Sequence, residues 1–415
     1  MIQQCYTMHD METLFETLKT FNKPGEMKGI TRLAYSKEDE AAHQFMVETM
    51  GEHGLFVRKD AIGNIFARLP GQNSQLPAVG TGSHLDTVPQ GGAYDGALGV
   101  VTGFYALMQF KAGELLRDLE LVIFRAEESS RFGFSCIGSK VMTGKVKADQ
   151  WAENVDDEGQ SFFQVNDDAG YASEKIASCC LPDHYFSAFI ELHIEQGKRL
   201  ESDGLTIGVV NGIAAPTRFA VLVRGHADHS GATPMYQRQD ALVASAMIIE
   251  DINHAACRES PWGTVATVGK MEIQPNSMNV IPGEVTFYVD IRGIEKSSIS
   301  RVASRLQEAV HKAEKDNDVT ITLREISSEE PVKLDDGLCD VLAQQCEKND
   351  ISYMKMLSGA GHDTMNLAQR YPAAMIFTPS KGGISHHPDE FTHFSDIEVA
   401  ATLLKETLRE LGNRQ

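Results

Sequence analysis

Four separate stretches of the chain contain the residue types that bind divalent metal ions. Three of them place histidine or glutamate just after an apolar run, and the fourth is a glycine-rich turn near the C-terminus. The candidates are His84 and Asp95, Glu127 and Glu128, His193, and His386. Imidazoles combined with carboxylates suit Zn²⁺, with Mn²⁺, Co²⁺ or Ni²⁺ as alternatives. One zinc ion takes about four ligands, so this set predicts two ions bridged by Asp95 and water.

The adjacent carboxylates Glu127 and Glu128 close the apolar run 119–124. Neighbouring side chains in an extended segment point in different directions, so one carboxylate can bind a metal while the other faces a bound water. A solvated acidic loop is the alternative for such a pair, and the apolar run before it weakens that alternative. Asp86, two residues after His84, is placed to accept the second imidazole N–H and fix the tautomer.

These residues need elements that bring distant segments together. Apolar segments typical of buried strands are interspersed with helix-like stretches, which indicates an α/β fold. The expected strands are 78–83, 119–124, 189–192 and 373–378, and the expected helices include 40–50, 96–110 and 339–349. Ligands of such sheets gather beyond the carboxyl ends of the strands. We therefore expect a mixed, mostly parallel sheet with helices on both faces and the polar residues at one edge.

The middle of the chain has a different order of elements. It predicts strands at 217–224, 264–273, 284–292 and 319–323, and helices at 240–256 and 299–313. The order βαββαβ is that of a ferredoxin-like α+β unit with an antiparallel sheet. A single core rarely grows past about 250 to 300 residues, and the chain has 415. We expect two domains, one made of 1–212 and 329–415 and one inserted at 213–328.

The composition narrows the class of partner. The chain has 38 basic and 58 acidic residues and a net charge of −20, which disfavours nucleic acid and anionic membranes. Its longest uncharged apolar stretch, 96–110, is shorter than the ~20 residues that cross a bilayer, and residues 1–23 lack a signal-peptide pattern. The seven cysteines are scattered without a CxxC pair, so we expect no disulfide framework and a cytoplasmic location.

Taken together, the motifs resemble those of the dinuclear metallo-amidohydrolases related to aminoacylase and carboxypeptidase. Within that family they are similar to the branch of N-carbamoyl-L-amino acid amidohydrolase, allantoate amidohydrolase and β-ureidopropionase. The resemblance extends from about residue 29 to the final helix. The motifs that carry it are His84-x-Asp86, Asp95-Gly96, Glu127-Glu128, His193-Ile194-Glu195-Gln196-Gly197 and Ile384-Ser385-His386. It implies that His84, Asp95, Glu128, His193 and His386 are the metal ligands, with Asp95 bridging, and that Glu127 is the general base.

The resemblance also implies residues for substrate recognition and a homodimer. His229 matches a family histidine that reaches the site of the partner subunit, so the inserted domain would serve as lid and dimerisation domain. Asn279 and Arg292 match the pair that holds the substrate carboxylate, and Gln196 and His362 match other substrate-contact positions. By themselves, His229 and Arg292 are more readily explained as solvated surface residues. Ser129 and the stretch 216–218 differ from the usual family pattern and leave the substrate side chain open.

The function we expect is metal-dependent hydrolysis of the carbamoyl C–N bond of an N-carbamoyl-L-amino acid, or of a related ureido acid such as allantoate, with release of ammonia and carbon dioxide. An N-acyl amino acid deacylase or a dipeptidase is the alternative within the family, because it uses the same metals with an alkyl-lined acyl pocket. A non-catalytic binder of metal or metabolite is the alternative of another class, and the presence of Glu127 argues against it.

Overall fold

The computed structural model describes residues 6–25, 28–146, 148–153, 155–328 and 330–414. The chain divides into two compact units, which are described separately. Unit 1 consists of Met1–Asn211, Leu334–Met356 and His362–Gln415, and unit 2 of Gly212–Lys333 and Leu357–Gly361. The return of the short segment Leu357–Gly361 to unit 2 had no signal in the sequence.

Unit 1 is built on a mixed sheet with parallel strands at its centre. The strand order is β1-β2-β4-β3-β5-β13-β6-β11, and β12 also pairs with β6; β11 and the last two residues of β6 and of β12 are counted with unit 2. The strands β4, β3, β5 and β13 are parallel neighbours, whereas β2 pairs with β4, and β6 with β13, in antiparallel fashion. Their bounds are β1 Phe56–Lys59, β2 Ile65–Leu69, β3 Ala78–His84, β4 Leu119–Phe124, β5 Phe186–Ile194, β6 Ile207–Ile213, β11 Val332–Lys333, β12 Tyr353–Ser358 and β13 Ala373–Thr378.

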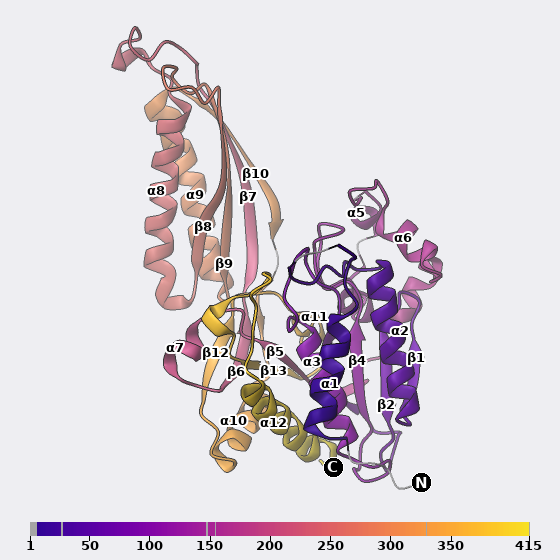
Figure 1. Ribbon diagram of the computed structural model, residues 1–415. Coiled ribbons are helices and arrows are strands. Elements are labelled where there is room, and N and C mark those ends of the chain that lie inside the picture. The colour runs from indigo at the N-terminus through magenta and orange to yellow at the C-terminus, as the bar shows by residue number, and fades with distance from the viewer. Residues whose placement is uncertain (1–5, 26–27, 147, 154, 329, 415) are drawn as a thin grey trace. The chain divides into compact units, whose positions relative to one another are not determined.

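Helices cover both faces of this sheet (Figure 1). On one face α3 packs on β3, β4 and β5 and contacts α1 and α12, while α4 and α11 pack on the other face, where Met142 and Leu367 join Val122 and Phe124 in one core cluster. The helices of unit 1 are α1 Met8–Lys19, α2 Lys37–Glu52, α3 Ala97–Met108, α4 Ile137–Met142, α5 Ala148–Glu153, α6 Phe162–Asp168, α7 Arg199–Asp203, α10 Asp336–Lys348, α11 Thr364–Leu367 and α12 Phe394–Gly412. Short 3₁₀ turns lie at Ser173–Cys179 and Lys381–Gly383.

Local sequence accounts for where several helices begin. The hydroxyl of Ser36 accepts the N–H of Asp39 at the start of α2, and the carboxylate of Asp240 accepts the N–H groups of Leu242 and Val243 at the start of α8. Helix α3 has no such side-chain cap, and every one of its residues is buried. Its position therefore depends on packing rather than on an amphipathic face.

Unit 2 has the order β7, α8, β8, β9, α9, β10. Its four strands form an antiparallel sheet in the order β10-β7-β9-β8, as expected of a ferredoxin-like unit. Helices α8 and α9 lie side by side along one face, where Ile248 and Leu306 pack on Val221 and Phe287 (Figure 1). The bounds are β7 Ala215–Arg224, α8 Ala241–Glu259, β8 Val265–Gln274, β9 Glu284–Gly293, α9 Lys296–Asn317 and β10 Thr320–Ser328, with 3₁₀ turns at Met235–Gln237 and Ser260–Trp262.

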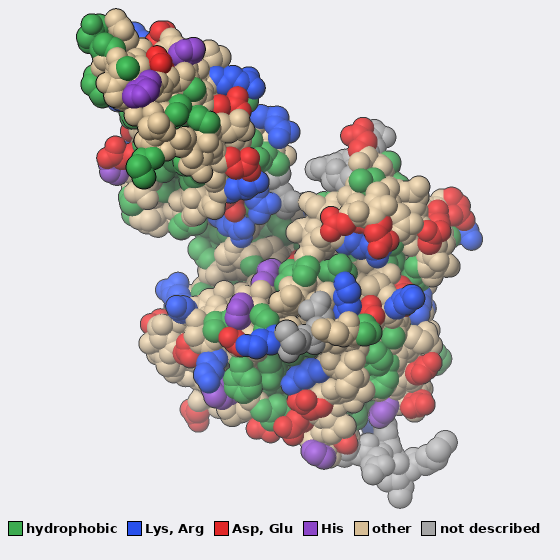
Figure 2. Space-filling model, turned by 45° about the horizontal axis from the view of Figure 1, so that its top comes forward, with side chains coloured by type: hydrophobic (Ala, Val, Ile, Leu, Met, Phe, Trp, Pro, Cys, Tyr) green, Lys and Arg blue, Asp and Glu red, His purple; other side chains and the backbone are tan. Residues whose placement is uncertain are grey.

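The fold confirms the predicted mixed α/β class with a mostly parallel sheet. The strands expected at 119–124 and 373–378 have those limits, and the strand expected at 189–192 is longer, because β5 spans Phe186–Ile194 and carries His193 within it. In the described part of the chain, no helix is both long and apolar enough to cross a membrane. The six described cysteines are free thiols, and Cys5 lies outside the described residues. Figure 2 shows acidic and basic side chains interspersed on the visible face.

Candidate active site

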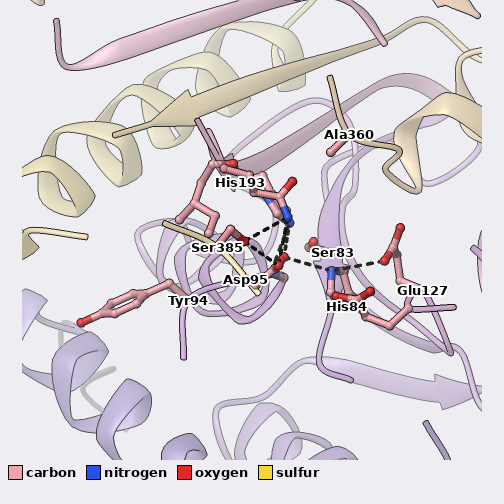
Figure 3. A network of polar contacts seen from close by, with 12 residues as sticks. Ser83, His84, Tyr94, Asp95, Glu127, His193, Ala360 and Ser385 are labelled. Atoms are coloured by element: carbon pink, nitrogen blue, oxygen red, sulfur yellow. Dashed lines mark hydrogen bonds and ion pairs between the residues drawn. The ribbon is translucent and has the colours of Figure 1, made fainter. Parts of the chain in front are cut away.

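Asp95 is the residue on which the site converges. It lies just before α3, and its two carboxylate oxygens face two different sets of side chains. Oδ1 lies 3.0 Å from His193 Nε2 and 3.7 Å from His84 Nε2, whereas Oδ2 lies 3.0 Å from His386 Nε2. Figure 3 shows Asp95 between His84 on one side and His193 on the other, with Glu127 beyond His84.

The second set is completed by Glu128. Its Oε1 lies 3.2 Å from His386 Nε2, the same nitrogen that contacts Asp95. The side chains therefore form two groups that share one carboxylate, and the candidate ligand atoms within each group lie within 4.8 Å of one another. The groups are His84, Asp95 and His193, and Asp95, Glu128 and His386.

Main-chain carbonyls fix the tautomers of two histidines. His84 Nδ1 lies 3.0 Å from the carbonyl oxygen of Asp86, and His193 Nδ1 lies 2.9 Å from that of Ile194. A carbonyl only accepts, so each Nδ1 carries the hydrogen and each Nε2 presents its lone pair to the site. The N–H of Gly96 also donates to His193 Nε2 over 3.2 Å. In this tautomer, a nitrogen lone pair would face the carboxylate of Asp95.

The contact between these imidazole nitrogens and Asp95 suits a bound metal cation. A lone pair and a carboxylate oxygen 3.0 Å apart repel each other unless a proton or a metal cation lies between them. Because Nδ1–H is committed to a carbonyl, the arrangement suits neutral imidazole as a ligand, with the second ring nitrogen oriented as metal-binding histidines require. The donor set of histidine nitrogens and carboxylate oxygens is one that zinc accepts. The described residues therefore fit a metal centre.

Asp86 holds the Glu127-Glu128 turn rather than the imidazole. We expected its carboxylate to accept the N–H of His84, but Oδ1 lies 3.7 Å from Nδ1 and the main-chain carbonyl of Asp86 makes the hydrogen bond instead. The carboxylate oxygens accept the main-chain N–H groups of Glu127, over 3.1 Å, and Glu128, over 2.9 Å. A spacing of two residues allowed either contact, and the direction of the backbone after β3 decides between them.

Glu127 is buried at the edge of the cluster. Its Oε2 lies 3.8 Å from His84 Nε2, and its Oε1 accepts a hydrogen bond from the thiol of Cys136 over 3.1 Å. Burial and the neighbouring charge of Glu128 raise the pKa of Glu127 well above its usual value. A divalent cation bound nearby would lower this pKa again, because positive charge favours the carboxylate form.

The other pKa shifts follow from the same crowding. Burial alone would raise the pKa of Asp95, but hydrogen bonds and positive charge from the protonated forms of His193 and His386 hold it well below its usual range. Burial opposes the charged form of His193, yet Asp95 raises its pKa to about 9. Hydrogen bonds with Asp95 and Glu128 raise the pKa of His386 to about 11. The pKa values of Asp95, His193 and His386 therefore depend on one another, and the buried carboxylate of Asp95 is stabilised by positive charge next to it.

Unusual backbone conformations concentrate at this site. Ala126, Gln196 and His386 all have positive φ, at 52°, 57° and 54°. Such conformations cost roughly 1–3 kcal/mol each in residues other than glycine and persist where the surroundings impose them. Gly96, next to Asp95, has φ 63°, and a Cβ there would lie 2.5 Å from the ring of His84. The turn that carries Asp95 therefore needs glycine in order to approach the imidazole.

Two residues to which the sequence assigned no role, Glu390 and Ser385, connect the turns of Asp95 and His386. Glu390 Oε1 accepts the N–H groups of Tyr94 and Asp95 over 2.9 and 3.0 Å, and its Oε2 accepts the hydroxyl of Ser385 over 3.1 Å. Ser385 Oγ also lies 3.2 Å from Asp95 Oδ2 (Figure 3). Ser385 belongs to the motif Ile384-Ser385-His386, whereas Glu390 lies four residues after His386, and nothing in the spacing indicated that Glu390 would point back to Asp95.

Gln196 and His362, expected to contact substrate, also lie in this cluster. Gln196 Nε2 donates to Asp95 Oδ2 over 3.0 Å, and its Oε1 is buried without a hydrogen-bond partner among the described residues. The ring of His362 packs edge-on against that of His193, with centroids 4.5 Å apart. Burial, followed by the repulsion of His193, lowers the pKa of His362 well below its usual value, so this imidazole is neutral.

Three expected recognition residues belong to unit 2, and the structure does not place them relative to the cluster in unit 1. His229 is exposed, and its Nδ1 accepts the N–H of Gly231 over 3.0 Å, so Nε2 carries the hydrogen and is a donor. Asn279 lies beside it, because the carbonyl of Asn279 accepts the N–H of Ser230 over 3.1 Å.

Arg292 lies at the end of β9 and is half-buried. Its Nε and Nη2 donate to Asp290 Oδ2 over 3.2 and 3.1 Å, and its Nη1 donates to the carbonyl of Gly359 over 2.9 Å. A guanidinium has five N–H donors, so these three contacts leave donors on Nη1 and Nη2 for an external carboxylate.

Comparison with known proteins agrees with this geometry. The profile of the Peptidase family M20/M25/M40 matches residues 80–410, and the chain belongs to this family. An allantoate amidohydrolase of Bacillus subtilis (strain 168) is 37% identical over 386 residues, which are 92% of this chain and 93% of the relative. An N-carbamoyl-L-amino-acid amidohydrolase of Paenarthrobacter aurescens is 34% identical over 403 residues, 97% of each chain.

A solved structure shows the same fold over nearly the full length. The hydantoinase/carbamoylase family amidase of Burkholderia multivorans superposes with a TM-score of 0.90 and 31% identity, covering 98% of each chain. The family resemblance of the motifs is thereby confirmed, and the comparison supports a hydrolase that acts on C–N bonds.

Proposed function

We propose that the protein is a metal-dependent amidohydrolase that cleaves the carbamoyl C–N bond of an N-carbamoyl-L-amino acid or of a related ureido acid such as allantoate. The products would be the free amine, ammonia and carbon dioxide. Support comes from relatives that carry the names allantoate amidohydrolase and N-carbamoyl-L-amino-acid amidohydrolase over nearly the whole chain. The single observation that carries the proposal is Asp95, whose two oxygens face two separate His/carboxylate groups.

Two divalent cations, most simply Zn²⁺, would be held by the five side chains of these groups, with Asp95 shared. Mn²⁺, Co²⁺ or Ni²⁺ are the alternatives, since all accept nitrogen and oxygen ligands. When bound, such ions supply Lewis acidity, which acidifies a water molecule and polarises the scissile carbonyl. His84 and His193 would bind through Nε2, because their Nδ1–H groups are held by carbonyls.

Glu127 would move the proton. Its Oε2, on the His84 side of the carboxylate, would take a proton from the attacking water and deliver it to the nitrogen that leaves. The C–N bond to the amine breaks as that nitrogen is protonated, and the carbamate that remains decomposes to ammonia and carbon dioxide. Asp86 would support this step by fixing the turn of Glu127 through its main-chain hydrogen bonds.

Unit 2 would recognise the substrate and complete the site as a lid and dimerisation domain. Arg292 and Asn279 would hold the substrate carboxylate, and His229 would donate from Nε2 to the developing oxyanion in the site of a second subunit. Gln196 would offer its Oε1, which has no hydrogen-bond partner among the described residues, to a substrate N–H, and His362, which packs on His193, would be a further substrate contact. A cytoplasmic location fits the free cysteines of the described chain, and the homodimer follows from the role proposed for His229.

A turnover screen tests this proposal. Purified protein reconstituted with Zn²⁺ or Mn²⁺ is assayed for ammonia released from allantoate, N-carbamoylglycine and N-carbamoyl-L-amino acids, and for acetate released from the matching N-acetyl compounds. We expect ammonia from at least one ureido acid at a higher kcat/KM than any acetate release. Faster acetate release would instead identify an N-acyl amino acid deacylase, and inertness across both panels would identify a binding protein.

A further inference from the structure

The thiol of Cys136 contacts the carboxylate that the proposed mechanism uses as its base. Sγ donates to Glu127 Oε1 over 3.1 Å, whereas the other oxygen, Oε2, lies on the side of His84 Nε2. Cys136 is only 1% exposed, so bulk water does not compete for this hydrogen bond. The two oxygens of Glu127 therefore have different surroundings, one against a thiol and one against the proposed metal ligands.

The backbone is arranged to bring this thiol to the carboxylate. The turn that begins α4 lies against the residues that follow β4, and three main-chain hydrogen bonds join them. They run from Cys136 N–H to Glu127 O (2.7 Å), from Ile137 N–H to Ala126 O (3.0 Å) and from Gly138 N–H to Arg125 O (2.8 Å). The side chains of Cys136 and Glu127 thus belong to two neighbouring loop segments that these hydrogen bonds hold together.

Both sides of this contact carry conformations that the surroundings must impose. Cys136 has φ 57° and Ala126, which precedes Glu127, has φ 52°, although neither is glycine. Gly138 makes the close approach sterically feasible, because a Cβ there would lie 2.6 Å from the backbone nitrogen of Arg125. Several features therefore converge on one outcome, the placement of a buried S–H donor against Glu127.

We infer that Cys136 is a positioning residue for the hydrolysis, because its S–H holds Oε1 of Glu127 so that Oε2 faces the substrate side for proton transfer. Burial and the nearby carboxylates of Glu127 and Asp363 raise the pKa of the Cys136 thiol well above its usual value, so it remains a donor at neutral pH. The inference rests on the proposed function, since it gives Glu127 the role of proton carrier.

Replacement of the thiol tests the inference. Cys136→Ala removes the S–H donor to Glu127. Cys136→Ser replaces it with an O–H donor, whose C–O bond is shorter than the C–S bond of cysteine. Cys339→Ala is the matched control, because Cys339 is equally buried and its thiol donates to the carbonyl of Val210, away from the site. Proper orientation of a base affects the chemical step, so we expect Cys136→Ala to lower kcat roughly tenfold with KM within about twofold and metal content unchanged. Cys136→Ser should recover at least part of this loss, and Cys339→Ala should match the wild type.

A double substitution separates positioning from general structural damage. If Cys136 acts through Glu127, adding Cys136→Ala to Glu127→Gln should leave the residual rate unchanged. An additive fall in rate overturns the inference, as does a Cys136→Ala protein with wild-type kcat or a Cys136→Ser protein as slow as Cys136→Ala. Should the alanine variant fail to fold, a loss larger than tenfold in folded Cys136→Ser also overturns it. An inactive wild type contradicts the proposed function instead.

Discussion

The two units hold their polar residues in different ways. In unit 1, four of the five proposed metal ligands are buried, and residues distant in the sequence contact one another directly. In unit 2, His229 and Asn279 are exposed and Arg292 is half-buried, and the partners recorded for them belong to unit 2 itself. Burial strengthens electrostatic interactions, and the shifted pKa values described above lie in the unit 1 cluster. On this account, unit 1 would hold the metal ions and the proton carrier, and unit 2 would add exposed or half-buried side chains that bind the substrate and the developing oxyanion.

Removal of metal is expected to have the largest effect. Chelation should abolish turnover, and addition of Zn²⁺ or Mn²⁺ should restore it, because the ligand set loses the cation that offsets its carboxylates. Metal at 100 times its Kd stabilises a protein by about 2.7 kcal/mol. Hydrogen exchange should therefore quicken in β3 and in 125–128 on chelation and stay unchanged in β7–β10. If chelation changed hydrogen exchange only in unit 2, the assignment of the metal site to unit 1 would be wrong.

Glu127→Gln should lower kcat by about 10² to 10⁴-fold, because the amide cannot carry the proton. Its metal content, measured by mass spectrometry, should equal that of the wild type, since Glu127 is outside the two ligand groups. A matched substitution, Glu128→Gln, should reduce the metal content as well as the rate. If both variants lose metal equally, the division of roles between these neighbours is wrong.

His229→Ala should lower kcat by roughly 10² to 10³-fold while metal content stays constant, as expected for loss of an oxyanion donor. The measurement that sharpens this result is a mixture of His229→Ala and Glu127→Ala chains. If His229 serves the site of a second subunit, the two inactive chains should partly restore each other's activity. A verified heterodimer without recovered activity would argue against a shared site.

Arg292→Lys should raise KM about tenfold with little change in kcat. The lysine keeps the charge but cannot make the bidentate contact with a carboxylate. Initial rates with an N-carbamoyl amino acid and with its amide, which lacks the carboxylate, provide the check. The wild-type preference for the acid should shrink in the variant, and an unchanged preference would remove Arg292 from substrate binding.

Substitution of two acidic residues outside the site, Asp39 and Glu259, should have the smallest effect on activity. We expect it to change only the stability of the fold. Burial by itself would raise the pKa of Asp39. The adjacent Arg125 guanidinium and His43 lower this pKa by a larger amount, so the pKa in the folded protein lies below the unfolded value of about 3.9. The stabilisation is thus present above about pH 4 and lost as the pH falls through the folded pKa. Asp39→Asn should flatten the fall of Tm below pH 4. Glu259→Gln in unit 2, where the half-buried carboxylate pairs with the exposed Arg301 at the surface, should change Tm less.

Much of the fold and the arrangement of the cluster followed from the sequence because both depend on local patterns. The apolar runs that end at His84 and Glu127 are strands, and parallel strands bring their carboxyl ends to one edge. The contacts of Cys136 and Glu390 did not follow, because they arise where turns from separate segments meet. Asp86 shows most clearly what the sequence could not predict. Its spacing from His84 predicted that the two residues lie close together, but the direction of the backbone after β3 decides which groups its carboxylate binds.

The central claim is that five side chains hold two metal ions around a shared Asp95. Anomalous scattering from a crystal of the zinc-loaded protein, collected at the zinc absorption edge, tests it most directly. The account predicts two anomalous peaks per chain, one among His84, Asp95 and His193 and the other among Asp95, Glu128 and His386. A single peak, or peaks bound by other residues, would contradict it.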